Sequence, residues 1–549
     1  MTAQHLKSLY ARPALLAAVI CIGLMVAGLY ARPLFPVDET RYLTVAWEMH
    51  QSGNWILPTL NHEAYHHKPP VLFWLINILW AIFGVSQSAA MAVPYLAAFA
   101  FLMATARLAT RLFPDNAQAP LMATAILAGS LPFVIYSNLI MFDLLLGVFS
   151  VLGITAVWDY MTTRNPKHLL SLAVVIGLGA ITKGPAILLH IGTVILLAKF
   201  WLRHPEHPLK KTIFPIILAI LGGAALALLW AIPAAIEGGK EFADKIFWGQ
   251  TAGRVVNAFD HQRPFYWYLI FAPLFALPWI ASPALWRGIR SIRTMTAQSL
   301  HTRQSMRFLL GWGIPVFLVF CLISGKQVHY LIPILPCLSL FFTAAFLNAP
   351  EELKARDLWP VLGTTAFLAL LPLLMKILAP VIAANINGNI HLEEAFGNIN
   401  ILPPIMLALL VLALAITIKG HKIRGLVTIS LAMMLMMCNF QIAAKTGFFR
   451  NYDLTPIATE LQKIDAATEG KQRPLAYLRN YHGEFGFLAR LDRPVKQLQP
   501  DDLAQWLAEN PDGLVFFRTK RKEEYARFHI LATIPYKLGS NYALVELPR

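Results

Sequence analysis

Residues 34–70 read LFPVDETRYLTVAWEMHQSGNWILPTLNHEAYHHKPP, and this stretch decides how the rest of the chain is interpreted. It follows a first apolar run and is the most polar, motif-dense segment in the first half of the sequence. It contains the acidic pair Asp38 and Glu39, the cation Arg41, and Lys68 directly before two prolines. Charges this dense between apolar segments indicate a loop at a membrane–water boundary. We therefore expect the rest of the chain to hold this loop above a cavity at one membrane face.

The composition is that of a polytopic membrane protein. Of 549 residues, 57% are hydrophobic and 14% are charged, whereas soluble domains carry about 25% charged residues. The formal net charge of +16 does not indicate nucleic acid, because polytopic proteins collect Lys and Arg in their cytoplasmic loops. The four cysteines lie in apolar stretches without disulfide or CxxC spacing, which is typical of apolar filler residues. Residues 14–30 are interpreted as an uncleaved first span rather than a signal peptide.

Apolar runs predict the membrane spans, since a helix needs about 20 apolar residues to cross the hydrocarbon core. Residues 71–84 are too short for this and follow Pro69 and Pro70, so we expect a helix that starts there and lies at the membrane interface. Residues 39–51 are a second candidate for an interfacial helix, with an ordinary loop helix as the alternative. The other runs predict about thirteen spans, at 13–33, 89–112, 118–137, 139–160, 168–182, 185–203, 212–236, 264–286, 308–324, 330–348, 358–380, 401–418 and 425–444.

The charges of the loops set the orientation of these spans. With the N-terminus in the cytoplasm, every second loop is basic, as the positive-inside rule requires. If residues 71–84 crossed the membrane, Arg107 and Arg111 would fall outside and the alternation would break. The loop at 34–88 therefore lies outside. The same orientation places the motifs NLIMFD, ITKGP, FDHQRP and SGKQVHY on the outer face.

The composition changes after about residue 444. Residues 445–549 are polar, contain no span, and mix strand-like segments such as LVFFR with helical segments such as DDLAQWLAE. Span parity places this segment outside. The sequence therefore predicts an all-α polytopic membrane domain at 1–444, with the external loop 34–88, and a small external α/β domain at 445–549.

Three carboxylates are candidates for the chemistry. Asp38 and Glu39 lie at the outer end of the first span, where a carboxylate can serve as a base, a metal ligand or a hydrogen-bond anchor. A solvated loop charge or a helix cap is the alternative for both. Asp143 stands alone beside the apolar run LLLGVFSVLGITAVW. Because ionisable residues at membrane depth are functional as a rule, Asp143 is the sharper signal.

Several cations on the same face are candidates for binding a phosphate. Arg41 offers a planar fork and Lys68 a point charge, with anchoring to lipid headgroups as the alternative. Lys183 lies between two apolar runs and precedes Gly-Pro, which indicates a break or re-entrant turn; a snorkelling lysine is the alternative. Lys326 and Tyr330 belong to a further external cluster, SGKQVHY.

The histidines His66, His67 and His261 raise the question of a metal site, because imidazoles with a carboxylate suit Zn²⁺. Their spacing matches no metal signature such as HExxH, so hydrogen-bonding loop histidines are the alternative. The sequence contains no DxD motif near a Gly-rich loop and no P-loop. Nothing in it therefore indicates a site for Mg²⁺ and a nucleotide.

The segments PVDETRY, HHKPPVLFWL, SNLIMFD, ITKGPAILL and SGKQVHYLIPILP, in this order, resemble the superfamily of bacterial aminoarabinose transferases and protein O-mannosyltransferases. These are membrane glycosyltransferases of the C-type fold. The resemblance covers roughly the first 350 residues, and the ordered set is specific although each motif alone is weak. The lipid A aminoarabinose transferases are the most similar branch, judged from the DExRY and KPP motifs, the span count and the external C-terminal domain.

The resemblance implies a polyprenyl-phosphate-linked sugar as donor and an acceptor at the periplasmic face of the bacterial inner membrane. The functional acids of the family match Asp38 and Asp143. The family's contacts to the donor phosphate match Arg41 and Lys68, with Lys183 in or near the cavity. Further candidates for the cavity are Glu39, Tyr42, Arg263, Lys326 and Tyr330.

The resemblance also implies a metal site, at positions that correspond to His67 and His261. The family typically has an acidic residue before the Pro-Pro lysine, so His67 departs from the pattern. This departure removes one negative charge near the donor phosphate. We expect that no cofactor is required, with Zn²⁺ as an option.

We expect an inverting glycosyltransferase that moves a sugar, 4-amino-4-deoxy-L-arabinose or a similar one, to lipid A or another envelope lipid. Two alternatives stay open: the same fold acting on protein Ser/Thr or core oligosaccharide, and a non-enzymatic transporter or lipid-binding protein. A transporter would show paired broken helices in two repeated halves, and the sequence contains no such repeat. We expect a monomer in contact with membrane lipids and without a nucleic-acid partner.

Overall fold

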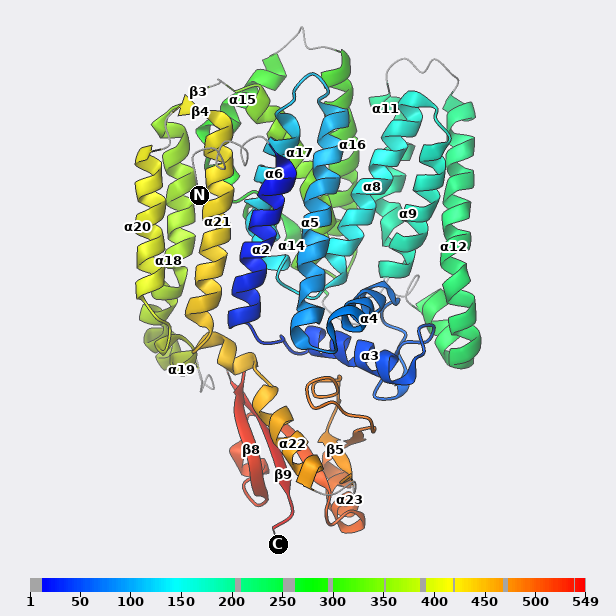
Figure 1. Cartoon of the computed structure of the whole chain (residues 1–549), viewed down its shortest axis with the longest axis vertical. Helices are drawn as coiled ribbons and strands as arrows, with labels where there is room; N and C mark the ends of the chain where they lie inside the picture. Colours follow the sequence, from blue (N-terminus) through cyan, green and yellow to red (C-terminus); the bar gives the residue numbers. More distant parts are fainter. Residues whose placement is uncertain are drawn as a thin grey trace.

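The computed structural model describes residues 12–202, 209–249, 262–294, 300–349, 352–385, 392–417, 420–467, 472–537 and 539–548. The chain forms a bundle of long helices with a smaller domain of strands and helices at one end (Figure 1). In the described part of the chain, eight helices are long and apolar enough to cross a membrane. The protein is therefore a polytopic, mainly helical membrane protein, as its composition predicts.

The long helices form the body of the bundle. Helix α8 is largely buried within it, whereas α12 and α18 expose large apolar side chains, such as Leu229 at 73% exposure. An apolar surface of this kind suits contact with lipid. The segments of span length are α2 (Pro13–Ala31), α5 (Gln87–Leu112), α8 (Phe142–Thr163), α12 (Leu209–Asp244), α16 (Leu300–Leu322), η3 with α17 (Val328–Ile334 and Leu335–Leu347), α18 (Ala355–Asn385) and α21 (Lys422–Ala444).

Three of the expected spans are broken into shorter pieces. The run at 264–286 divides where Pro278 and Pro283 occur, because proline lacks the backbone N–H and constrains the residue before it. The runs at 118–137 and 185–203 also divide, so the count of thirteen spans stays a prediction. The pieces are α6 (Ala119–Ala128), α7 (Leu131–Tyr136), α10 (Ala186–Leu196), α11 (Ala198–Trp201), α14 (Trp267–Phe275), η2 (Trp279–Ala281) and α15 (Pro283–Thr294).

The remaining short elements connect the long ones or extend them. They are α9 (Lys167–Lys183), η1 (Lys245–Gly249), β3 (Glu352–Leu353) paired with β4 (Gly420–His421), α19 (Leu392–Gly397), α20 (Leu402–Thr417) and η4 (Phe448–Tyr452). Helix α9 packs along α8 and α12. It ends at Gly184, whose φ of 67° favours glycine. This ending fixes the position of the preceding lysine.

Two helices of the first loop lie across one end of the bundle, between the long helices and the C-terminal strands (Figure 1). They are α3 (Asp38–Ser52) and α4 (Val71–Phe83), joined through the hairpin of β1 (Thr59–Leu60) and β2 (Glu63–Ala64). With 13 residues, α4 is too short to cross a membrane, as its length predicts. Asn77 fixes α4 on α3 by donating a hydrogen bond to the carbonyl of Ala46, at 3.0 Å.

The C-terminal segment contains a five-stranded sheet in the order β6-β5-β7-β9-β8. The β5 strand is parallel to β6 and β7, whereas β9 is antiparallel to β7 and β8. The α22 helix covers one face with Ile457 and Leu461, and α23 covers the other with Leu503 and Leu507. The elements are α22 (Thr455–Ala467), β5 (Leu475–Leu478), β6 (Lys496–Leu498), η5 (Pro500–Asp502), α23 (Leu503–Glu509), β7 (Leu514–Thr519), η6 (Lys522–Glu524), β8 (His529–Tyr536) and β9 (Ser540–Glu546).

The loop after β5 joins this C-terminal unit to α3. The buried hydroxyl of Thr44 donates to the carbonyl of Gly483 at 2.8 Å and accepts from the backbone N–H of Phe487 at 3.0 Å. The Phe487 ring stacks on Trp80, with ring centroids 5.2 Å apart. Trp47 adds a hydrogen bond from its indole N–H to the carbonyl of Leu491, at 2.8 Å. These contacts fix the position of the C-terminal unit against α3 and α4.

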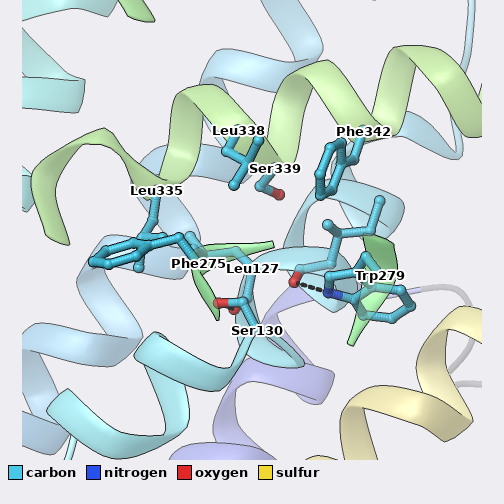
Figure 2. Close-up of a pocket in the computed structure, with 9 residues that line it drawn as sticks. Leu127, Ser130, Phe275, Trp279, Leu335, Leu338, Ser339 and Phe342 are labelled. Carbon is cyan, nitrogen blue, oxygen red and sulfur yellow. Dashed lines mark hydrogen bonds between the residues drawn. The ribbon is translucent and has the colours of Figure 1, made fainter. Parts of the chain in front are cut away.

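A small internal cavity between α6, η2 and α17 is a packing void (Figure 2). Its volume is about 10 Å³, room for at most one water molecule. Two polar groups in its wall already have partners, because Trp279 donates to the carbonyl of Ile126 at 2.8 Å and Ser130 donates to that of Leu127 at 2.7 Å. The functional site therefore lies elsewhere.

Candidate functional site

Two residues far apart in the sequence form a buried ion pair at the end of the bundle that faces α3. Asp143 lies in the first turn of α8, and Lys183 is the last residue of α9. The Nζ of Lys183 lies 2.5 Å from Oδ1 of Asp143, and the exposed fractions of the two side chains are 15% and 5%. The expected break at Lys183 is the end of α9 at Gly184. The structure thus pairs Asp143, the strongest acidic candidate, with Lys183, one of the candidate phosphate-binding cations.

Lys68 approaches the same place from the loop before α4. Its ammonium lies 5.6 Å from the centroid of the Phe142 ring, and Phe142 directly precedes Asp143. Tyr42 of α3 packs edge-on against the same ring, with centroids 5.1 Å apart. A cation over an aromatic face is held electrostatically by the ring. Tyr42, predicted for the cavity, and Lys68, predicted for the donor phosphate, therefore meet on one side of Asp143.

The 3-10 segment η3 covers the other side of Asp143. The Tyr330 ring lies under the Lys183 ammonium, 4.6 Å from centroid to Nζ. His329 places Nε2 3.9 Å from Oδ2 of Asp143, so both carboxylate oxygens face nitrogen groups. His329 belongs to the SGKQVHY motif, but sequence alone did not single it out as a partner of Asp143. Its contact depends on how η3 packs against α8.

Asp38 lies at the start of α3, and its carboxylate is exposed and only weakly paired. Its side chain is 53% exposed, and its nearest cation is Arg41, 3.9 Å from Nη1 to Oδ1. The hydroxyl of Tyr42 donates to the same oxygen at 3.4 Å. Arg41 is itself only 23% exposed. Asp38 and Arg41 thus stand beside each other with a weak contact, which leaves the carboxylate open to other partners.

Glu39 is buried and holds two loops together. Its Oε2 accepts from the guanidinium of Arg32 and, at 2.7 Å, from the backbone N–H of Phe35. Its Oε1 accepts from the backbone N–H of Ile140 at 2.7 Å. Because Ile140 lies just before α8, this carboxylate links the start of α3 to the loop that positions Asp143. Sequence reasoning gave Glu39 to the cavity but did not find Arg32, its partner.

Asn138 fixes the same loop from the opposite side. Its Oδ1 accepts from Tyr95 at 3.1 Å and from Gln441 at 2.8 Å, while its own amide donates to the carbonyl of Val134 at 2.6 Å. These partners come from α5, α21 and α7. A buried amide with this many partners resists movement. The loop before Asp143 is therefore held in place from three helices.

A cavity of about 420 Å³ has Asp38, Glu39 and His329 in its wall. Most of its lining is apolar and comes from α7, α21 and η4, including Ile135, Met437, Phe440, Phe448 and Phe449. A space of this size is within the range of small-ligand sites. It joins a polar edge that contains the candidate carboxylates to a largely apolar interior.

Lys326 and Arg263, both predicted for the cavity, contact each other but are not among the described residues that line it. The ammonium of Lys326 is buried and donates to main-chain carbonyls, at 3.0 Å to that of Arg263 and also to that of Ile323. The backbone N–H of Arg263 donates to the carbonyl of Ser324 at 3.1 Å, while its side chain is exposed. One contact is local and the other reaches a distant segment, so Lys326 ties the segment before η3 to the backbone at Arg263.

The proposed metal ligands do not form a described site. The His67 ring lies 4.2 Å from the His66 ring, centroid to centroid, and His261 falls outside the described residues. Across the ranges that the structure covers, no group of three or more His, Cys, Asp or Glu residues is placed to hold a metal ion. A zinc site needs three or four such ligands. Because His261 is not described, a zinc site at His67 and His261 stays a prediction, and no chemical step is assigned to a metal.

A family model described as dolichyl-phosphate-mannose-protein mannosyltransferase matches residues 67–237, which include Lys68, Asp143 and Lys183. The chain is also similar to two proteins named undecaprenyl phosphate-alpha-4-amino-4-deoxy-L-arabinose arabinosyl transferase. One, from Enterobacter sp. (strain 638), is 27% identical over 360 residues; the other, from Yersinia pestis (strain Pestoides F), is 26% identical over 355 residues. The chain is therefore similar, over part of its length, to aminoarabinose transferases and to the protein mannosyltransferase family model.

The sequence match to these two relatives is partial. It covers 64% and 63% of this chain and 62% and 61% of the two relatives. The aligned region therefore spans about three fifths of the length of each relative.

Two solved membrane proteins share the C-type glycosyltransferase fold with this chain over nearly its whole length. The crystal structure of ArnT from Cupriavidus metallidurans bound to undecaprenyl phosphate has a TM-score of 0.72 and 17% identity, and covers 99% of this chain and 98% of that one. The oligosaccharyltransferase AglB from Archaeoglobus fulgidus, in complex with an inhibitory peptide and a dolichol-phosphate, has a TM-score of 0.51 and 13% identity. It covers 93% of this chain and 69% of that one. The resemblance predicted from the ordered motifs is confirmed.

Proposed function

We propose that this protein is a glycosyltransferase that uses a polyprenyl-phosphate-linked sugar as donor. The sugar is 4-amino-4-deoxy-L-arabinose or a similar one, and the acceptor is lipid A or another envelope lipid. The observation that carries this proposal is the convergence of Asp143, Lys183 and Lys68, from three separate segments, next to a largely apolar cavity. The superfamily and the names of the curated relatives support the same reaction class.

The donor phosphate is the leaving group, and the sugar transfers with inversion in one displacement. Breaking the anomeric C–O bond leaves negative charge on the phosphate, which Arg41, Lys68 and Lys183 neutralise. Such contacts strengthen in a site drier than bulk water. Since Lys183 is paired with Asp143, the phosphate and Asp143 compete for the same ammonium. Donor binding therefore loosens the ion pair and makes the carboxylate available to the sugar.

The roles of the two acids depend on the acceptor. A hydroxyl acceptor needs a base, and Asp38 is the candidate because its side chain is exposed and only weakly paired. A lipid A phosphate is already anionic near pH 7 and needs no base. Asp38 and Asp143 then orient the sugar and stabilise the positive charge that develops on its ring. Tyr42 and Tyr330 pack beside these groups, against Phe142 and Lys183 respectively.

The reaction takes place at the periplasmic face of the bacterial inner membrane. The alternation of basic loops supports this orientation, because it places the first loop outside. The enzyme works as a monomer among membrane lipids. The lipid monophosphate of the donor is itself the leaving group, so the reaction does not need a metal ion and a nucleotide. Metal analysis of the purified protein tests the option of a zinc site: stoichiometric zinc that is lost on His67→Ala would assign a metal to this residue.

Transfer from an undecaprenyl-phosphate aminoarabinose donor to lipid A, followed by mass spectrometry, tests the proposal. The unmodified protein in proteoliposomes should add the mass of the sugar to lipid A, whereas a double variant Asp38→Asn, Asp143→Asn should not. Absence of transfer by correctly folded protein, with several prenyl-phosphate pentoses and hexoses offered, would overturn the proposed function.

A protein acceptor is the second candidate function. The family model that matches residues 67–237 is described as a protein mannosyltransferase, and this favours protein Ser/Thr as an alternative acceptor. Core oligosaccharide is a further acceptor for the same donor chemistry. Comparing lipid A, core sugar and envelope glycoproteins from cells with and without the gene separates these acceptors. A glycan change confined to protein would assign the alternative.

A further inference from the structure

The junction between α3 and the C-terminal sheet brings basic side chains to the edge of the cavity. Arg518 lies on β7, and Lys537 directly follows β8. Both side chains are exposed. Both cations approach the buried Tyr536 ring at 5.3 Å from its centroid, Arg518 through Cζ and Lys537 through Nζ. Two exposed cations are thus held close to one aromatic ring.

The acid Glu484 acts electrostatically on both cations, in the direction that raises the pKa of each, but it forms no ion pair with either of them among the described residues. No carboxylate of the described residues lies within ion-pair distance of Arg518 or Lys537. Partial burial lowers the pKa of Lys537 first, and the positive charge of Arg518 lowers it further, whereas Asp38 raises it. Burial also lowers the pKa of His482, where the positive charges of Arg41 and Arg518 act in the same direction. Arg41, Arg518 and Lys537 therefore stand at one junction, between α3 and the end of β8.

The backbone of Lys537 is anchored to a segment that lines the cavity. Its backbone N–H donates to the carbonyl of Asn451 at 2.7 Å, and the next residue, Tyr452, lines the cavity. Tyr452 packs edge-on against Phe35, another lining residue, with centroids 5.4 Å apart. Unpaired cations beside a largely apolar space suit one kind of ligand, an anionic headgroup on an apolar tail. Phosphate is the anion that lysine and arginine bind most readily on lipids.

We propose that Arg518 and Lys537 bind the phosphate of the acceptor lipid, whose apolar part enters the cavity. The inference rests on the proposed function, in which Lys68 and Lys183 take the donor phosphate at Asp143. A second phosphate then needs its own cations, and those of the C-terminal sheet lie at the Asp38 side of the cavity. The C-terminal unit thereby helps to select the acceptor.

Binding of a defined lipid tests the site without relying on catalysis. Phosphatidate carries one phosphate on an apolar tail, diacylglycerol carries the tail alone, and inorganic phosphate carries the anion alone. The unfolding temperature of the detergent-solubilised full chain should rise with phosphatidate but not with either of the other two. In the double variant Arg518→Gln, Lys537→Gln the rise should disappear. Equal protection by inorganic phosphate would assign a free-phosphate site and overturn the lipid assignment.

Lys496→Gln is the matched control, because Lys496 is an exposed lysine on β6, at the opposite edge of the sheet from β8. It should bind phosphatidate like the unmodified chain. Since all three replaced side chains are exposed, the variants should keep the unliganded unfolding temperature. A double variant that still responds to phosphatidate like Lys496→Gln would refute the site.

Kinetics separate this inference from the proposed function. In the double variant, KM for lipid A should rise at least about tenfold, the size expected for loss of a charge-assisted contact, while KM for the donor stays unchanged. Unchanged KM for lipid A would contradict the acceptor site while leaving the glycosyltransferase assignment intact. Failure of the unmodified protein to transfer at all would instead contradict the proposed function, and phosphatidate binding would still report on the site.

Discussion

Lys183 Nζ lies 2.5 Å from Asp143 Oδ1, although the two residues are 40 positions apart in the sequence and belong to different helices. The end of α9 meets the start of α8 at this point. A buried carboxylate is stable next to such a cation, and each charge would be costly without the other. The pair therefore links the stability of the bundle to the site where the donor phosphate is proposed to bind.

Asp143→Asn should reduce kcat/KM for transfer by more than about 100-fold, as for loss of a group that acts directly in the reaction. It should also lower the free energy of unfolding by about 3 kcal/mol, because Lys183 keeps its charge without a partner. Transfer assays and thermal unfolding measure the two effects. Asp159→Asn is the control: Asp159 is an equally buried acid of α8, paired with Arg111 at 2.8 Å at the other end of the helix. Near-normal turnover of Asp143→Asn would refute the assignment.

Asp38→Asn should abolish transfer with little loss of stability. Its side chain is 53% exposed and its contact with Arg41 is 3.9 Å long, so few favourable contacts disappear. The unfolding temperature should stay close to that of the unmodified protein, while turnover falls by at least about 100-fold. If turnover persisted, Asp38 would be a solvated loop charge.

Glu39→Gln should act through the position of Asp143. The buried carboxylate accepts hydrogen bonds from Arg32 and from the backbone of Phe35 and Ile140, and an amide cannot accept all of them. We expect a loss of about 3 kcal/mol in stability and a fall in kcat.

The control for Glu39→Gln is Glu48→Gln in the same helix. Glu48 also accepts from two backbone N–H groups, those of Asn61 at 2.7 Å and His62 at 3.0 Å, but it does not contact the loop before α8. It should lower stability and spare kcat. Equal kcat values for the two variants would show that Glu39 does not position Asp143.

Thr44→Val should loosen the C-terminal unit. The change keeps the shape of the side chain but removes the acceptor for Phe487 N–H and the donor to Gly483, at a cost of about 1–3 kcal/mol. Hydrogen exchange of the loop between β5 and β6 should become faster. Thr365→Val serves as a control, because its buried hydroxyl donates within its own helix, to Val361, at 3.0 Å. Unaltered exchange in Thr44→Val would argue against this junction.

Acid should weaken the same junction through His482. Burial and the positive charges of Arg41 and Arg518 hold the pKa of His482 below its usual 6.5 in the folded protein. The unfolded chain then binds a proton more readily, so the contribution of His482 to stability is complete above pH 6.5 and is lost as the pH falls below it. The unfolding temperature should fall less between pH 7 and pH 5 in His482→Gln. Parallel curves for both proteins would contradict this prediction.

The sequence alone determined the class of protein and the set of motifs. Long apolar runs predict membrane helices because the bilayer core demands them, and the shortness of residues 71–84 correctly excluded a span there. The ordered motifs around Asp38, Lys68, Asp143 and Lys183 also predicted the resemblance to aminoarabinose transferases, which the comparisons support. Breaks within apolar runs were harder to predict, since hydropathy at 264–286 is uninterrupted while Pro278 and Pro283 divide the helix.

Only the tertiary structure decided which of these side chains meet. Charge and spacing assigned Lys183 to a phosphate and Glu39 to the cavity, whereas packing paired Lys183 with Asp143 and buried Glu39 against Arg32. The contact between α3 and the C-terminal unit, made by Thr44, likewise cannot be predicted from local sequence. The physical reason is that a motif fixes the chemistry of a side chain, but contacts between distant segments depend on how whole helices pack.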